Sequence, residues 1–306
     1  MKKLILSALC AVCGLTSLSA QNALQNEILE VAHRTNNYFM TKYSDPTIDT
    51  YVKKVRTSNL WTRAVYYEGL MALYEIDPQQ RYLDYTDRWA DYHKWTARHS
   101  VNDTDADNQC CQQTYIDRYV QTGGKKDLSQ VKANLDHQMS TYRVSYWTWI
   151  DAIQMAMPVY AKYAKLTGER KYLDYAMNSY KWSRDTLAGG LFNKEEGLWW
   201  RDKDYVPPYK EKDGSNCYWS RGNGWVYAAL VRVMETLPKN DKYYAFLKKD
   251  FIAMSQAFLK CQREDGYWNV SLVCPANYGG PEMTGTGLFL CGMAWGVRQG
   301  ILPQAK

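Results

Sequence analysis

The chain has 306 residues, of which 46% are hydrophobic and 14% aromatic, and a formal net charge of +6 at pH 7. Its basic residues are scattered along the sequence rather than clustered, which argues against a nucleic-acid-binding protein. The hydrophobic content is sufficient for a sizeable core in one large domain or two small ones, and composition alone does not choose between them.

The first twenty residues have the layout of a secretory signal peptide. Two lysines precede an apolar stretch from Leu4 to Leu15, and small residues follow up to Ala20. This stretch is too short to span a bilayer, and no later segment reaches the ~18 to 20 apolar residues of a transmembrane helix. We therefore predict a signal peptide at 1–20, a single mature domain at 21–306, no membrane span, and export to the periplasm or beyond the cell.

The cysteines and histidines do not indicate a metal or cofactor. Six of the eight cysteines lie after the leader without the regular spacing of a disulfide scaffold, and we expect most of them to be buried apolar residues. The four histidines make no HExxH or CxxC arrangement, so metal-free and cofactor-free chemistry is expected. Cys10 and Cys13 follow large residues rather than the small residue of a lipobox, which makes a lipid anchor the weaker alternative.

A repeat of one helix, a short turn and a second helix organises the mature chain. Equivalent positions at the start of the second helix, Tyr82, Asp127 and Tyr172, are separated by 45 residues each, and Tyr243 follows after 71. Repeats of this kind are typical of stacked helical hairpins, which stay open or curl into a barrel. The periodicity predicts few strands and helices at 22–44, 59–76, 79–97, 107–122, 126–140, 150–167, 169–186, 222–237, 241–262 and 284–300.

The longer interval in the repeat places an insertion at Gly189–Cys217. Long connections in a compact domain are uncommon and often carry function. This one contains Trp199, Trp200, Arg201 and Tyr209. Exposing so much aromatic side-chain surface to water without a function is costly in free energy. We predict that it contributes to a site; the alternative is a solvent-exposed excursion with a small hairpin.

Two acidic residues, Asp107 and Asp151, stand at the starts of predicted inner helices. If the stack curves, both face one mouth, where two carboxylates suit acid catalysis on a sugar. Asp is also a favoured helix N-cap that complements the positive end of the helix dipole. Spacing alone favours the capping role.

The segment Tyr218–Trp225 opens another inner helix and combines two glycines, two indoles and a guanidinium. Glycine permits close backbone approach, Trp219 and Trp225 offer stacking faces, and Arg221 can bind a carboxylate with two hydrogen bonds. This combination suits an acidic sugar. The alternative is a tight turn into the helix, with the tryptophans packed in the core.

Tyrosine and tryptophan make up most of the aromatic content, with 26 Tyr and 12 Trp against 6 Phe. Both side chains join an apolar face to a polar edge, which suits carbohydrate stacking, although many must pack between helices. Trp61, Tyr66 and Tyr67 on the first inner helix are candidates for a wall of the site.

Three motifs are diagnostic in combination. Trp149-Ile150-Asp151 precedes Met155, Trp-Ser-Arg-Gly-Asn-Gly-Trp spans 219–225, and Gly285-Thr286-Gly287 leads to a Gly-Met-Ala-Trp-Gly segment. With these motifs the chain resembles glycoside hydrolase family 105, the unsaturated rhamnogalacturonyl and related unsaturated glucuronyl hydrolases. The resemblance extends from about residue 25 to the C-terminus.

The resemblance implies an all-α (α/α)6 barrel of six inner and six outer helices, with the site at one mouth. The family's general acid matches Asp151, and its second acidic residue matches Asp107. The candidate substrate-binding residues are Trp149, Met155, Arg221, Trp225, Trp219, Arg201, Trp61 and Tyr66.

The reaction implied by the resemblance is hydration of a double bond rather than displacement at the anomeric carbon. Acid protonates C4 of a C4=C5 enol ether, water adds at C5, and the resulting hemiketal rearranges and releases the neighbouring sugar. One well-placed acid therefore matters more than a nucleophile and acid pair. The expected partner is an oligosaccharide with an unsaturated uronate at its non-reducing end.

Several departures from the family pattern are visible. Gln112 and Ala64 stand where relatives have glycine, which suggests small differences in substrate, and Arg201 stands where some members have histidine. The chain ends at Lys306, where relatives continue for another helical pair. We therefore expect a helical-hairpin toroid that is incomplete at its C-terminus, with an open seam.

Two other functions remain open from the sequence. An endo-acting glycosidase on the same kind of barrel would need carboxylates in nucleophile and acid roles, and the sequence has no adjacent Asp-Asp pair on an inner helix. A non-catalytic helical-repeat protein would bind the carbohydrate and use its acidic residues only as caps.

Overall fold

The computed structural model describes residues 23–304, so the predicted signal peptide lies outside the described residues. The described residues divide into two compact units, one of residues 23–58 and 69–89, the other of residues 59–68 and 90–304. The prediction of a single mature domain stays a prediction. Within 23–304, no helix combines the length and the apolar character needed to cross a membrane.

The smaller unit contains a helix at 23–42, the strands β1 (Thr50–Val52) and β2 (Lys54–Arg56), the second half of α2 (Trp61–Ile76), and most of α3 (Gln80–Tyr92). The two strands pair antiparallel in a short hairpin that the periodicity did not predict. On α3 the rings of residues 82, 85 and 89 are all buried, which is the spacing of one apolar helix face.

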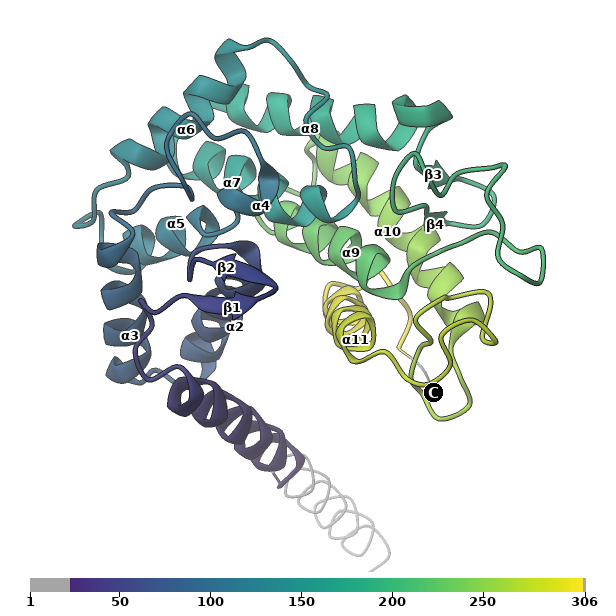
Figure 1. The fold of residues 1–306 in the computed structure, drawn as a ribbon, viewed down its shortest axis with the longest axis horizontal. Coiled ribbons are helices and arrows are strands. Elements are labelled where there is room, and N and C mark those ends of the chain that lie inside the picture. Colours follow the sequence, from purple (N-terminus) through teal and green to yellow (C-terminus); the bar gives the residue numbers. More distant parts are fainter. Residues whose placement is uncertain (1–22, 305–306) are drawn as a thin grey trace, which may run out of the picture. The chain divides into compact units, whose positions relative to one another are not determined.

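The larger unit has an inner and an outer layer of helices (Figure 1). The inner helix α9 (Ser220–Met234) packs between α7 (Asp151–Thr167) and α11 (Met283–Arg298). The outer helix α8 (Arg170–Asp185) packs on α7, and α10 (Lys242–Cys261) packs on α9. Helix α7 is buried on nearly every face whereas α8 is exposed along one side, as expected for an inner and an outer helix.

The repeated tyrosines tie neighbouring outer helices together. The hydroxyl of Tyr172 on α8 donates to Asp136 on α6 (Ser129–Ser140) at 2.7 Å. One repeat later, the hydroxyl of Tyr243 on α10 donates to Asp174 on α8 at 2.7 Å. The sequence repeat is therefore a repeated hydrogen bond between successive outer helices.

Helix α7 contains a proline, and a side chain of the neighbouring inner helix α5 (Gln112–Gln121) supplies the hydrogen bond that this proline cannot make. Pro158 has no N–H to donate to the carbonyl of Gln154, four residues earlier. The buried side chain of Gln113 donates to that carbonyl instead, with its Nε2 at 2.9 Å. This bond joins α5 to α7 one turn after Asp151.

The predicted helices all occur among the described residues, with one correction. The segment predicted as a helix at 107–122 forms two, α4 (Ala106–Gln109) and α5, separated at Cys110 and Cys111. Both cysteines keep helical backbone angles, but the N–H of Gln113 bonds to the carbonyl of Cys110, a tighter i−3 bond. The step is therefore a local tightening of one helical path.

Candidate active site

Asp151 is the first residue of α7, and its carboxyl group is buried with 7% of the residue exposed. The N-cap position belongs to Ile150, and no side chain caps this helix end. Oδ2 of Asp151 has no hydrogen-bond partner among the described residues. The capping alternative therefore does not account for Asp151.

Burial raises the pKa of Asp151 to about 6. The nearby guanidinium groups of Arg201 and Arg221 act in the opposite direction, and the carboxylate of Asp202 adds to the rise. A carboxyl group with this pKa stays protonated in part of the population near neutral pH, which a general acid requires.

The insertion after α8 is attached to the start of α7 by main-chain contacts. It contains the short hairpin of β3 (Phe192–Asn193) and β4 (Leu198–Trp199). A small hairpin is what the alternative interpretation, a solvent-exposed excursion, predicted for this insertion. Beyond the hairpin, Trp149 and Asp202 form an antiparallel bridge, and the N–H of Ile150 donates to the carbonyl of Arg201 at 2.9 Å. These contacts hold Arg201 beside the acid.

Arg201 is itself held by an ion pair with Asp202, whose residue is only 9% exposed. Because the pair is formed by adjacent residues in a bridged segment, the guanidinium has a defined direction. A paired cation also lowers the pKa of Asp151 less than a free one would.

The glycines of the 219–225 motif allow the inner helices to meet closely. A Cβ on Gly222 would lie 2.8 Å from Cδ1 of Ile150 and 2.9 Å from Cε3 of Trp219. A Cβ on Gly285 at the start of α11 would lie 2.1 Å from Oγ of Ser220. The close approach of Gly222 to Ile150 brings the start of α9 against the residue that precedes Asp151.

Asn223 in the same motif fixes the insertion to α9. Its buried side chain accepts from the N–H of Trp199 at 2.8 Å and donates to the carbonyl of Trp199 at 3.0 Å. Within one helical turn, Asn223 therefore binds β4, Gly222 allows close packing against Ile150, and Arg221 is placed beside Trp219.

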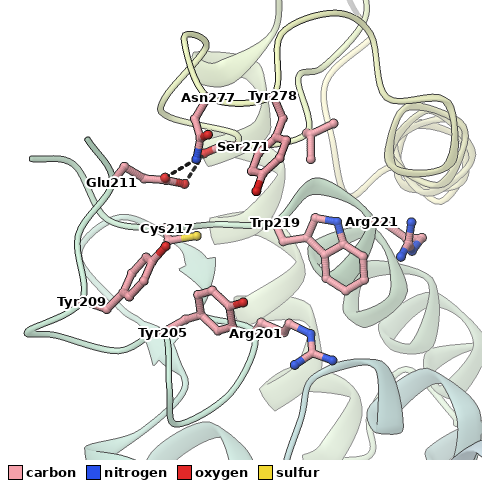
Figure 2. A pocket seen from close by; sticks show the side chains of 11 residues that line it. Arg201, Tyr205, Tyr209, Glu211, Cys217, Trp219, Arg221, Ser271, Asn277 and Tyr278 are labelled. Carbon is pink, nitrogen blue, oxygen red and sulfur yellow. Dashed lines mark hydrogen bonds between the residues drawn. The ribbon is translucent and has the colours of Figure 1, made fainter. Parts of the chain in front are cut away.

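A cavity of about 450 Å³ opens beside this motif (Figure 2). Arg221 lies with its guanidinium carbon 4.1 Å from the centre of the Trp219 ring, and that of Arg201 lies 5.9 Å away. Nε of Arg221 is buried without a hydrogen-bond partner among the described residues. The cavity lining consists of Arg201, Tyr205, Tyr209, Glu211, Cys217, Trp219, Arg221, Val270, Ser271, Asn277 and Tyr278.

Asp151 itself and most of the other predicted site residues lie outside this lining. Asp107 is half-buried in the first turn of α4, which packs against α7, and the cap of α4 is Asp105, whose carboxylate accepts from the N–H of Asp107 at 2.9 Å. Trp149 is half-buried at the bridge with Asp202. Met155 is fully buried in α7, so the structure gives it a packing role rather than the expected substrate contact.

The aromatic residues predicted as a wall lie outside this lining and take part in two ring pairs. Trp225 is 7% exposed and meets Trp61 edge to face, with ring centres 6.3 Å apart. Tyr66 is half-buried, with its ring against Tyr67.

Gln112 is fully buried and donates to Asn134 on α6 at 2.8 Å, so this departure from the family pattern joins α5 to α6.

Sequence reasoning missed Glu211, which lines the cavity and is 6% exposed. Its carboxylate accepts from Oγ of Ser271 at 2.9 Å and from the side-chain amide of Asn277. Both donors come from the loop between α10 and α11, 60 and 66 residues later in the sequence. No local pattern marks such a contact; the only signal was its place in the insertion.

No group of three His, Cys, Asp or Glu side chains within 23–304 is arranged to hold a metal ion. Of the six cysteines among the described residues, Cys110, Cys111 and Cys274 are buried, Cys217 and Cys261 are half-buried and Cys291 is exposed, so the expectation that most are buried holds for only half of them.

Comparison with known proteins gives a consistent picture. The sequence profile described as Glycosyl Hydrolase Family 88 matches residues 31–306. A protein of Alteromonas sp. (strain LOR) named unsaturated 3S-rhamnoglycuronyl hydrolase is 38% identical over 164 residues, which cover 52% of this chain and 38% of that protein. A protein of Formosa agariphila with the same name is 30% identical over 264 residues, which cover 80% of this chain and 69% of that protein.

Solved structures are similar to the chain over most of its length. A glycosyl hydrolase family 88 protein from Bacteroides vulgatus is 32% identical with a TM-score of 0.81, covering 90% of this chain and 80% of that one. A family 105 glycoside hydrolase from C. acetobutylicum is 23% identical with a TM-score of 0.65, covering 80% of this chain and 73% of that one, and shares the fold. The predicted all-α, α/α-barrel fold class is confirmed.

Proposed function

Because the chain belongs to glycoside hydrolase family 88, we propose that it releases a terminal 4,5-unsaturated uronic acid from an oligosaccharide by acid-catalysed hydration of the enol ether. The resemblance to the unsaturated uronyl hydrolases that the sequence motifs carried is confirmed by the profile match and by the named relatives.

The observation that carries the proposal is the environment of Asp151. Its carboxyl group is buried, has a free Oδ2 and has its pKa raised to about 6 by burial. Such a group is protonated in part of the population near neutral pH, and its Oδ2 has no hydrogen-bond partner among the described residues. In the proposed reaction Asp151 delivers this proton to C4 of the unsaturated sugar, and water then adds at C5.

The arginines beside Asp151 suit the charge of the substrate. The guanidinium of Arg221 lies over Trp219 and keeps an unpartnered buried Nε, so it is available to bind the uronate carboxylate. Arg201 lies at the same end of the cavity. We assign carboxylate binding to Arg221, stacking to Trp219, and the role of second acidic residue to Asp107 on the adjoining helix α4.

The names of the two relatives support a uronate joined to rhamnose as the substrate class. We extend this class to the chain as a proposal, because the Alteromonas relative matches over only 38% of its own length.

The proposal is tested by incubating the protein with oligosaccharides made by a polysaccharide lyase and following the ultraviolet absorbance of the enol ether. An unsaturated uronyl hydrolase removes the absorbance. An endo-acting glycosidase would generate new reducing ends and leave the absorbance unchanged, and a binding protein would do neither. The last two outcomes would overturn the proposal.

We also propose that the protein is exported, on the basis of the charged, apolar and small-residue order of segment 1–20. Intact-protein mass spectrometry of the exported product should give an N-terminus between Ala20 and Asn22. A soluble cytoplasmic product that retains Met1 would refute export.

A further inference from the structure

The cavity has two chemically different halves. Arg201, Trp219 and Arg221 form the half next to Asp151. The remainder, which we call the outer half, includes Tyr205, Glu211, Ser271, Asn277 and Tyr278. If the uronate occupies the arginine half, the sugar that follows it in the oligosaccharide extends toward the outer half.

The outer half offers aromatic faces from two different loops. Tyr205 belongs to the insertion, and Tyr278 to the loop between α10 and α11, and both project into the cavity (Figure 2). Tyr278 is 72% exposed and holds a positive φ of 55°, which is uncommon for a residue other than glycine. Exposed tyrosine rings bordering a cavity are suited to stacking on a sugar.

Glu211 gives the outer half a negative charge that no cation neutralises. Its carboxylate accepts from the neutral side chains of Ser271 and Asn277, and the thiol of Cys217 also hydrogen-bonds to it, so its partners among the described residues are uncharged. A carboxylate has about four lone-pair sites, so these three bonds leave capacity for one further donor. Sugar hydroxyls are donors that match this capacity, whereas a sulfate has only acceptor oxygens and a charge of the same sign.

We propose that the outer half of the cavity binds the sugar residue that follows the uronate, and that Glu211 makes this subsite prefer a sugar with free hydroxyls over a sulfated one. The inference rests on the proposed function, because it takes the arginine half as the place of the uronate. The preference that we propose differs from the 3S-rhamnoglycuronyl substrate in the names of the two relatives.

Glu211 also joins two loops, so its selective role must be separated from a structural one. The test uses two disaccharides, an unsaturated glucuronate linked to rhamnose and the same compound with a 3-O-sulfate on the rhamnose. Kinetic constants are measured for the wild type, Glu211→Gln and Glu196→Gln. Glu196 is the matched control, because it is an exposed acid of the same insertion that binds Asn216 and lies outside the cavity lining.

The wild type should favour the unsulfated compound by about tenfold in kcat/KM, since like charges facing each other in a partly desolvated site are costly. Glu211→Gln keeps the size of the side chain and one acceptor oxygen, but it removes the charge and replaces the other oxygen by a donor NH2 group. It should reduce the preference to within about threefold, mainly by lowering KM for the sulfated compound. Glu196→Gln should retain the wild-type ratio.

A wild type that prefers the sulfated compound, or a Glu211→Gln variant with an unchanged ratio, would overturn the proposal. If Glu211→Gln does not fold, Tyr278→Ala tests the subsite: KM should rise about threefold or more for both compounds, with kcat and the thermal midpoint nearly unchanged. An unchanged KM would show that the outer half does not hold the second sugar.

Failure of the proposed function is recognised separately. In that case neither compound loses its enol-ether absorbance. Calorimetric titration of the wild type with both disaccharides then still measures the predicted order of affinities. Equal affinities, or no binding, would refute the subsite.

Discussion

The main-chain N–H of Ile150 donates to the carbonyl oxygen of Arg201 at 2.9 Å, although 51 residues separate them in the sequence. Through this bond the insertion after α8 is attached to the residue that precedes Asp151. The guanidinium of Arg201 and the carboxyl group of Asp151, which would act on one substrate, are therefore carried by two backbone segments that this bond joins. The following expectations depend on this arrangement.

Asp202→Asn should shift the pH dependence of turnover. The carboxylate of Asp202 raises the pKa of Asp151, whereas the guanidinium of Arg201 lowers it. Asp202 also pairs with Arg201, which weakens the effect of that guanidinium on Asp151. Removing the charge therefore lowers the pKa of Asp151 below about 6 on both counts. A general acid works in its protonated form, so activity on the alkaline limb should be lost at a lower pH than in the wild type.

The measurement is the pH profile of kcat/KM for Asp202→Asn beside that of Asp204→Asn. Asp204 is a suitable control, since its side chain is 73% exposed and pairs only loosely with Lys203 at 3.6 Å. A uniform loss of activity without displacement of the limb would mean that Asp202 merely supports the structure.

Asp151→Asn should stabilise the protein at neutral pH. The pKa of Asp151 in the folded state, about 6, lies above the unfolded value of 3.8, so the folded protein favours the protonated form. The stability from this group is complete below the unfolded pKa and is lost as the pH rises through about 6. Asparagine avoids this loss, which corresponds to about 3 kcal/mol for a shift of this size.

Thermal unfolding checks the expectation. The midpoint of Asp151→Asn should exceed that of the wild type by several degrees at pH 7.5, and the difference should shrink below pH 5. An equal difference at both pH values would mean that the effect does not come from the titration of Asp151.

Arg221→Ala should raise KM for the unsaturated uronate, because the substrate carboxylate loses a bidentate partner. Methyl esterification of the substrate should raise KM of the wild type in the same way and should have little further effect on the variant. Steady-state kinetics of both proteins on acid and ester form a double cycle. If the wild type treats acid and ester alike, Arg221 is structural.

Gly222→Ala should impair both stability and turnover. The added Cβ would lie 2.8 Å from Cδ1 of Ile150, so the start of α9 must move away from the residue before the acid. Overpacking of this kind costs about 1 to 3 kcal/mol. Gly69→Ala is the control, since a Cβ there meets nothing within 4 Å and alanine favours the helix. Comparable stability and activity of the two variants would refute the close-approach role.

The sequence predicted the features that are local in the chain. Asp151 and Arg221 each lie in a short motif at a helix start, and the repeat of 45 residues located the outer helices, because both patterns are contained in neighbouring residues. Glu211 was missed because its partners come from a distant loop, and the burial of Met155 was missed because a helical position does not reveal which face meets the cavity. The step at Cys110 has no proline or glycine to mark it in the sequence.

The measurement that tests the central claim most directly is the loss of enol-ether absorbance catalysed by Asp151→Asn, with its fold verified by circular dichroism and thermal unfolding. General acid catalysis is worth about 10²- to 10⁴-fold, and asparagine keeps the shape of the side chain but has no proton to deliver. The account predicts a folded variant that still binds the disaccharide and turns it over at least about a hundredfold more slowly. A folded variant that retains more than about a tenth of the wild-type rate would contradict the assignment of Asp151 as the general acid.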